Sequence, residues 1–195
     1  QLSTMSTTPK LPPFASLTNR DALANALTIL FEPSPTLIAQ LAPALEPAVP
    51  VLASYESLID LSVHTLLSLP ADAQATFIAG HPRIGEVSGL SALSTAEQAR
   101  VVTSTAVLAR LALLNALYEK RYTGLRYITF VNGRTRAEVA REMENKLEIE
   151  HSLDAETPSV DDVEPTQDQD AWQKELKRAV EDVGRIAKSR LKVLL

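Results

Sequence analysis

Apolar residues recur at intervals of three and four along most of this chain, and this spacing constrains the fold more than any other feature. It is clearest over residues 18–31 and 171–194, where the apolar positions form one stripe of an amphipathic helix. Glycine is scarce, aromatic residues make up only 5% of the chain, and alanine and leucine are frequent, a mixture that suits helices better than strands. We therefore predict an all-α fold, a single-domain bundle of about eight helices.

Three segments depart from the helical pattern. Residues 1–17 are rich in Ser, Thr and Pro and predict a disordered N-terminal tail, which leaves residues 18–195 as the helical domain. Residues 151–170 hold seven acids and two prolines, as expected of a solvated acidic linker. The β-branched and aromatic residues near 126–131 resemble a strand, but no second strand is available for pairing, so we expect a short extended segment packed against helices.

Composition excludes several classes of function. A formal net charge of -5 without a basic stripe argues against a nucleic-acid partner. No apolar run approaches the roughly 20 residues needed to span a bilayer, so we expect no membrane partner. The chain has no cysteine, and its three histidines are too scattered to form a metal cage. The C-terminal residues are not the Ser-Lys-Leu peroxisomal signal, so the cytoplasm is the expected compartment, with peroxisomal import by another route still open.

The stretch from His81 to Gln98 is the natural candidate for a functional site. It brings an imidazole, an acid and an amide close together in sequence, and with Gly80 it holds three of the chain's six glycines between two helical runs. Within it, Ser94 and Glu97 have the spacing of a capping box, in which the serine caps a helix and the glutamate bonds back to it. His81 follows a helix that ends at Gly80, so an alternative role for its imidazole is to close that helix end.

Five short motifs in order resemble the 2-oxo-4-hydroxy-4-carboxy-5-ureidoimidazoline (OHCU) decarboxylase family, which catalyses the third enzymatic step of urate breakdown. They are His81-Pro82, Ser94 to Gln98, Asn115 to Tyr122, Leu125 to Thr129, and Arg190-Leu191. The resemblance covers roughly residues 18–195. It implies an all-helical carboxy-lyase, usually a homodimer, that converts its small-molecule substrate to (S)-allantoin in purine metabolism without a metal or organic cofactor.

The resemblance also implies roles for individual residues. His81 would be the catalytic histidine, with Glu97 and Arg190 as its charged catalytic partners. The pocket for the planar ring and the ureido group would be shaped by Pro82, Ser94, Gln98, Leu125, Tyr127, Ile128 and Thr129.

The chemistry of these residue types agrees with the implied reaction. A histidine can move a proton near neutral pH, and a nearby glutamate would hold the imidazole in one tautomer and raise its pKa. An arginine offers a planar, permanently charged fork for a carboxylate or an enolate. For Arg190, which lies near the end of the last helix, the alternative is that it complements the helix dipole.

Several positions depart from the family pattern. Only thirteen residues separate His81 from Ser94, Arg126 replaces a proline, Asn132 stands where many members have arginine, and residues 151–170 look like an insertion. The alternative interpretation is a diverged helical protein that binds or processes another anionic heterocycle, or one that keeps the pocket only as a non-catalytic binding module.

Overall fold

The computed structural model describes residues 9–99 and 103–195, apart from the side chains of residues 98 and 99. Over these residues the chain is helical and contains no strand, which confirms the predicted all-α bundle. In chain order the elements are η1 (Phe14–Thr18), α1 (Arg20–Phe31), η2 (Leu37–Leu41), α2 (Ala42–Leu45), η3 (Glu46–Val51), α3 (Tyr55–Ser68), α4 (Ala71–Ile78), α5 (Ala92–Ala99), α6 (Thr105–Arg121), α7 (Arg136–Leu147), η4 (Val160–Asp162) and α8 (Gln169–Leu194).

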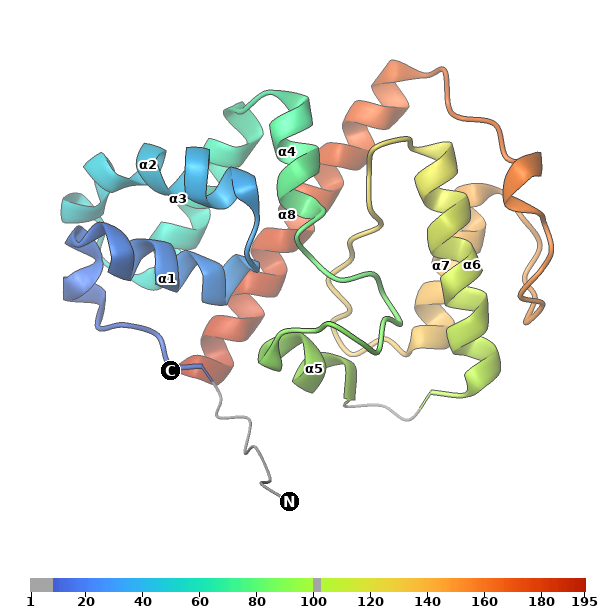
Figure 1. Cartoon of the computed structure of the whole chain (residues 1–195), viewed down its shortest axis with the longest axis horizontal. Coiled ribbons are helices and arrows are strands. Elements are labelled where there is room, and N and C mark those ends of the chain that lie inside the picture. The colour runs from blue at the N-terminus through green and yellow to red at the C-terminus, as the bar shows by residue number, and fades with distance from the viewer. Residues whose placement is uncertain (1–8, 100–102) are drawn as a thin grey trace.

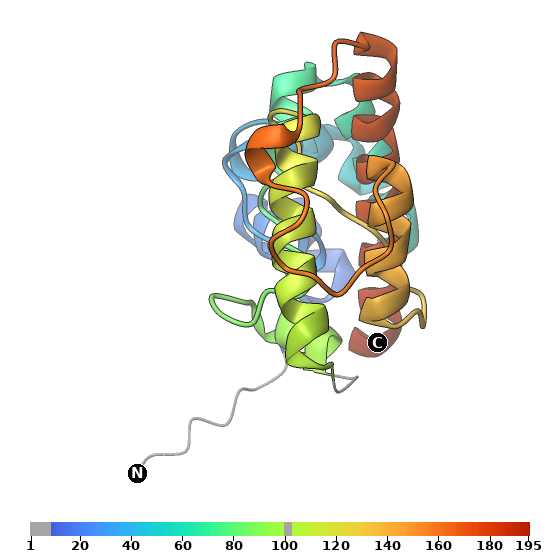
Figure 2. The same ribbon diagram turned by 90° about the vertical axis from the view of Figure 1, so that its right-hand side faces the viewer.

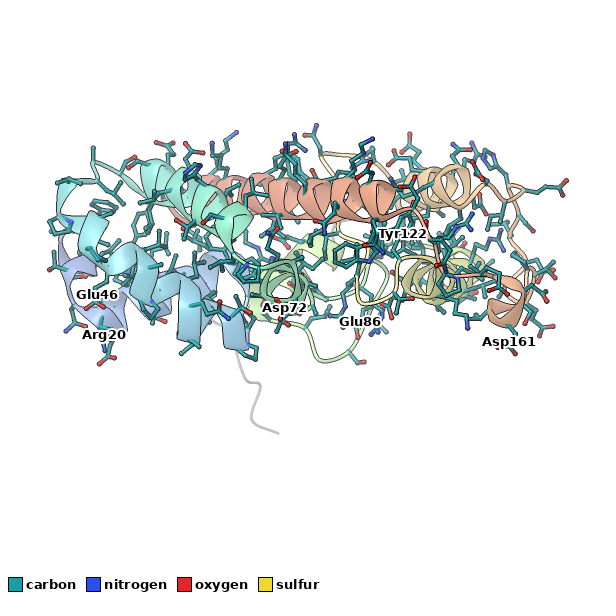
Figure 3. All side chains as sticks on the ribbon, turned by 90° about the horizontal axis from the view of Figure 1, so that it is seen from above. Arg20, Glu46, Asp72, Glu86, Tyr122 and Asp161 are labelled. Carbon is teal, nitrogen blue, oxygen red and sulfur yellow. The ribbon has the colours of Figure 1, made fainter. Side chains whose placement is uncertain are left out.

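The bundle is organised around α8, a helix of 26 residues that runs diagonally between two groups of helices (Figure 1). Helices α1 to α4 lie on one side of it, and α6 and α7 lie on the other. Seen from above, α8 follows one face of an elongated molecule, with Arg20 and Glu46 paired at one end and Asp161 at the other (Figure 3). Both groups of helices therefore meet along a single helix.

Close packing of α3 on α8 depends on Gly184. A Cβ atom at this position would lie 2.5 Å from Cγ2 of Val63 on α3, closer than two carbon atoms can approach without a shift. The buried apolar positions of α8 recur at helical spacing and form the stripe expected from the sequence, namely Leu176, Ala179, Val180, Val183, Ala187 and Leu191. The glycine thus lets two backbones approach where the stripe meets the N-terminal helices.

The helical path after α1 differs from the sequence prediction. In the sequence, Ser34-Pro35 has the pattern of a helix start, and Pro43 and Pro47 predict the end of one short helix. The helical path instead continues to Val51. It changes from a π-helical turn (η2) to α-helix (α2) and then to a 3₁₀ turn (η3). Each of these two prolines lies at the first or second position of a new helical type, where proline is tolerated. The predicted boundary was wrong for this reason.

Part of the predicted N-terminal tail is packed on the bundle, so the tail prediction is wrong for residues 9–17. Leu11 and Leu17 are buried, and Phe14 makes an edge-to-face contact with Tyr55 at a centroid distance of 5.3 Å. The Tyr55 hydroxyl donates to the carbonyl of Pro12 at 2.7 Å. Three apolar anchors on a stretch already stiffened by proline are enough to order it. Residues 1–8 lie outside the described part of the chain.

The acidic segment, residues 151–168, is exposed but anchored. Most of its side chains face solvent, as expected of a linker, and the segment passes across α6 (Figure 2). Arg110 of α6 is 1% exposed, pairs with Glu144 of α7 at 2.8 Å, and donates to the backbone carbonyls of Asp154 and Thr157. One buried guanidinium therefore ties α6, α7 and the acidic segment together.

The extended segment near 126–131 is confirmed, since residues 125–131 form neither helix nor strand. It connects α6 to α7 and runs on the side of these two helices that faces α8 (Figure 1), and Arg178 of α8 donates to the carbonyl of Ile128 at 2.8 Å. Asp182, one turn further along α8, accepts from the backbone N–H of Phe130 at 3.2 Å. Side chains of α8 thus take the place of a partner strand.

No helix in the described part of the chain has the length and hydrophobicity to cross a membrane.

Candidate active site

His81 lies immediately after α4, in a position fixed by the end of that helix. The N–H groups of Gly80 and His81 donate to the carbonyls of Phe77 and Ile78, both at 3.1 Å. Only glycine fits at position 80, because a Cβ atom there would lie 2.7 Å from the carbonyl oxygen of Pro33. The imidazole is 3% exposed and stands 6.2 Å from the ring of Phe77, so the backbone delivers it into the interior.

The environment of His81 keeps its imidazole neutral. Burial lowers its pKa to about 3, the positive charges of Arg190 and Arg126 act in the same direction, and the negative charge of Glu32 only partly opposes them. Neither ring nitrogen has a hydrogen-bond partner among the described residues. The sequence-based expectation that a glutamate raises this pKa was therefore wrong: desolvation dominates, and Glu97 pairs with Arg190 instead.

The loop after His81 is held from two sides. Arg83 pairs with Glu119 of α6 at 2.7 Å, and the side chain of Asn115, also on α6, donates to the carbonyl of Ile84 at 3.0 Å. On the other side, the guanidinium of Arg126 donates to the carbonyls of Ala79 and His81. The residue that departs from the family pattern at position 126 is thus a brace for the histidine loop.

The start of α5 differs from the predicted capping box. The helix begins at Ala92, and the hydroxyl of Ser91 accepts from the N–H of Ser94 at 3.2 Å, so Ser91 takes the capping place expected of Ser94. Ser94 lies inside the first turn and is 1% exposed. Its hydroxyl donates to the carboxylate of Glu32 at 2.5 Å. The capping box was wrong because both of its side chains are used in tertiary contacts, Ser94 with Glu32 and Glu97 with Arg190.

Arg190 joins the C-terminal part of α8 to α5 and to the end of α1. Its Nε and Nη2 atoms donate to the two carboxylate oxygens of Glu97 at 2.8 and 3.0 Å. Nη2 also donates to Glu32 at 2.8 Å and to the hydroxyl of Ser94 at 3.0 Å. One buried cation therefore stands between two carboxylates, and the three groups together carry a net negative charge.

A cavity of about 370 Å³ opens beside these groups, a volume in the range of small-molecule sites. It brings together eight of the ten site residues expected from the sequence: His81, Pro82, Ser94, Glu97, Tyr127, Ile128, Thr129 and Arg190. Leu125 is not among its lining residues, being 2% exposed in the hydrophobic core. The side chain of Gln98 lies outside the described residues.

Sequence reasoning missed three groups of the site. In the sequence, Glu32-Pro33 indicates only the end of the first helix, and nothing local marks Glu32 as a partner of Arg190. Arg134 and Arg136, from the turn before α7 and its first residue, also line the cavity. The guanidinium of Arg134 donates to the carbonyls of Val131 and Phe130 and pairs with Glu142. A turn signal at Asn132-Gly133 followed by two arginines was the available hint.

The arrangement defines a helical protein with a partly open cavity of small-molecule size, a neutral histidine at its wall, and a carboxylate–arginine cluster beside it. Within the described residues, no group of three or more His, Asp and Glu side chains is placed to hold a metal ion. The chain matches the sequence model of the OHCU decarboxylase family over residues 16–160. Because this match covers well over half of the chain, the protein belongs to the OHCU decarboxylase family.

This family is one of decarboxylases, and a cavity of this volume is suited to a small-molecule substrate. The matched residues include His81, Ser94 and Glu97 but end before α8, so the family match does not cover Arg190, which the fold brings into contact with Glu97. No curated protein and no solved structure matches the chain.

Proposed function

We propose that this protein decarboxylates 2-oxo-4-hydroxy-4-carboxy-5-ureidoimidazoline to (S)-allantoin in urate breakdown, and that His81, Glu97 and Arg190 carry the reaction. The observation that carries the proposal is the neutral imidazole of His81, which lies at the wall of the cavity in a member of this family. Neither of its ring nitrogens has a hydrogen-bond partner among the described residues. A buried polar group without a partner is costly to maintain, and an incoming ligand can supply the missing bond.

His81 is suited to act as a general base. In the proposed reaction the bond between the ring carbon and the carboxylate breaks, CO₂ leaves, and the bonding electrons pass into the adjacent ring imine. The substrate hydroxyl gives its proton to His81 and becomes a carbonyl. His81 then returns that proton to the neighbouring carbon, and solvent supplies the proton that neutralises the ring nitrogen. The substrate provides its own electron sink, so the protein positions groups and moves protons.

The low pKa of His81 fits the resting site, because an imidazole must be neutral to accept a proton. A substrate that carries a negative charge raises the pKa of a nearby histidine, since an opposite charge favours the protonated form. Binding of the carboxylate substrate would therefore move the basicity of His81 toward the value needed for proton transfer. Burial also strips water from the carboxylate that leaves, which favours loss of CO₂ over the solvated anion.

Arg190 can receive the substrate carboxylate only by exchange, because its guanidinium is already paired. The side chain of Glu97 is 38% exposed, whereas that of Glu32 is 5% exposed. Glu97 also occupies the Nε–Nη2 edge of the guanidinium, which offers two parallel donors to a carboxylate. In the proposed complex the substrate carboxylate takes this edge, and Glu97 turns into the cavity to hydrogen-bond the ring or His81.

The test generates the unstable substrate in situ from urate with urate oxidase and hydroxyisourate hydrolase, and follows the circular dichroism of the product. We expect the protein to accelerate formation of (S)-allantoin over spontaneous decay. His81→Asn should remove most of the acceleration, since asparagine cannot accept the proton. His64→Asn is the matched control, because His64 is exposed on α3, and it should retain native activity. A native chain that leaves the spontaneous rate unchanged would refute the proposal.

We also propose that the protein is a homodimer, as is usual in the family. Light scattering coupled to size exclusion tests this directly, with a mass of twice 21.2 kDa as the expected result. A single 21.2 kDa species across the working concentration range would contradict it.

A further inference from the structure

Glu32 stands at the end of α1 in a backbone conformation that side-chain-bearing residues rarely adopt. Its φ is 63° and its ψ is 152°, a region that is essentially reserved for glycine. Holding a non-glycine residue there costs on the order of 1–3 kcal/mol. Glycine would avoid this cost, yet the position carries a charged side chain that is only 4% exposed. The strained backbone at Glu32 is therefore kept for the sake of its carboxylate, whose contacts show what it does.

The Glu32 carboxylate is held by three donors from two other helical regions. Ser91 and Ser94 at the start of α5 donate to it at 2.7 and 2.5 Å, and Arg190 of α8 donates at 2.8 Å. Burial acts to raise the pKa of Glu32, but the charge of Arg190 and the hydrogen bonds of both serines outweigh burial and leave the pKa below its usual value. The carboxylate is ionised at neutral pH and fixed in place.

The guanidinium of Arg190 has two differently used sides. Toward α1, Nη2 meets Glu32 and Nη1 lies 3.4 Å from the carbonyl of Leu30. Toward the cavity, Nε and Nη2 meet Glu97. Glu97 and Arg190 line the cavity, whereas Glu32 does not. Arg190 thus has a buried counter-ion behind it and a partly exposed one in front.

We propose that Glu32 is a positioning residue that holds Arg190 from behind, so that the cavity-facing edge of the guanidinium stays in place while Glu97 and a substrate carboxylate exchange on it. Without Glu32, release of Glu97 would leave the guanidinium without a carboxylate partner and free to rotate away from the cavity. The inference deepens the proposed function and rests on it for the identity of the exchanging carboxylate.

The test compares Glu32→Gln with Glu144→Gln. Both changes neutralise a buried carboxylate that is paired with a buried arginine, but Glu144 lies on α7 and does not line the cavity. We expect Glu32→Gln to raise KM at least fivefold with a smaller change in kcat, because substrate binding loses its oriented partner. Glu144→Gln should keep KM within twofold of the native value. Kinetics are measured well below the melting temperature of each variant.

Glu32→Gly covers the case in which the glutamine variant folds poorly. Glycine accepts the observed φ and ψ without strain, so this variant removes the carboxylate and relieves the backbone together. We expect the same rise in KM as for Glu32→Gln, with a melting temperature closer to that of the native chain. A KM within twofold of native in both Glu32 variants would overturn the inference.

A second measurement does not depend on activity. The Nε–H of Arg190 is hydrogen-bonded in a side chain that is 2% exposed, so its exchange with solvent is slow. Nuclear magnetic resonance can follow this proton, with Arg190→Lys to assign its signal. We expect protection to fall at least tenfold in Glu32→Gln and to persist in Glu144→Gln. If the chain has no decarboxylase activity but Glu32→Gln still lowers the protection of the Arg190 Nε–H, the positioning role stands and the proposed function fails. Unchanged protection of this proton in Glu32→Gln would refute the positioning role itself.

Discussion

The buried, neutral state of His81 predicts a specific dependence of stability on pH. An unfolded histidine binds its proton with a pKa of about 6.5, whereas folding lowers the pKa of His81 to about 3. Between these values the unfolded chain binds more protons than the folded chain, so stability falls as the pH is lowered. From pH 7.5 to pH 5 the loss from this one group is about 2 kcal/mol, at roughly 1.4 kcal/mol per pH unit below 6.5. His81→Asn should remove this contribution.

Urea unfolding at pH 7.5 and pH 5 measures the prediction. The lower value stays above the range in which paired carboxylates such as Glu32, whose pKa is lowered, begin to bind protons. We expect the native chain to lose about 2 kcal/mol more than His81→Asn between the two conditions. His64→Asn, which removes an exposed imidazole, should lose as much as the native chain. An equal loss in native and His81→Asn would show that His81 is protonated as readily in the folded chain as in the unfolded one.

Three further predictions concern packing and support of the site. Gly184→Ala should destabilise the fold by about 1–3 kcal/mol in urea unfolding, because the new Cβ would clash with Val63. Val63→Ala in the same chain should restore part of this loss, whereas additive losses from the two substitutions would contradict the clash. Arg110→Met should cost about 3–5 kcal/mol by leaving a buried carboxylate unpaired, and it should open the acidic segment to limited proteolysis. Arg126→Gln should lower kcat by releasing the carbonyl of His81 while the melting temperature changes little; native kinetics would exclude the bracing role.

Most of the helices could be predicted because their signals are local. Asn19, Ser54 and Thr135 each cap the helix that follows, with side-chain acceptors placed as the sequence spacing requires. The stripe on α8 needs only its own periodicity. Prediction failed where the outcome depended on neighbours: the path through Pro43 and Pro47 uses three helical geometries in succession, and no local rule distinguishes that path from a stop.

The site could be predicted only in part, for a related physical reason. Motif order grouped His81, Glu97 and Arg190, and all three line one cavity, while their catalytic roles stay a prediction. It did not give their pairing, because Glu32, 158 residues away along the chain, bonds to the same guanidinium. Nor could a sequence show that burial decides the pKa of His81. The pairing of Arg190 with Glu32 depends on a long-range contact, and the low pKa of His81 depends on burial. Spacing along the chain encodes neither.

The pair formed by Glu32 and Arg190 also has a consequence for the order of folding. Its two members are 158 residues apart, so the contact cannot form before α8 has been synthesised. During synthesis, α1 emerges from the ribosome long before α8 and must wait for its counter-ion. Until then Arg190 cannot hold the carboxylate of Glu32, and the backbone at Glu32 can leave its strained φ and ψ for a more favourable conformation. Assembly of the cavity is therefore a late event, and intermediates that lack α8 should neither bind nor protect a substrate analogue.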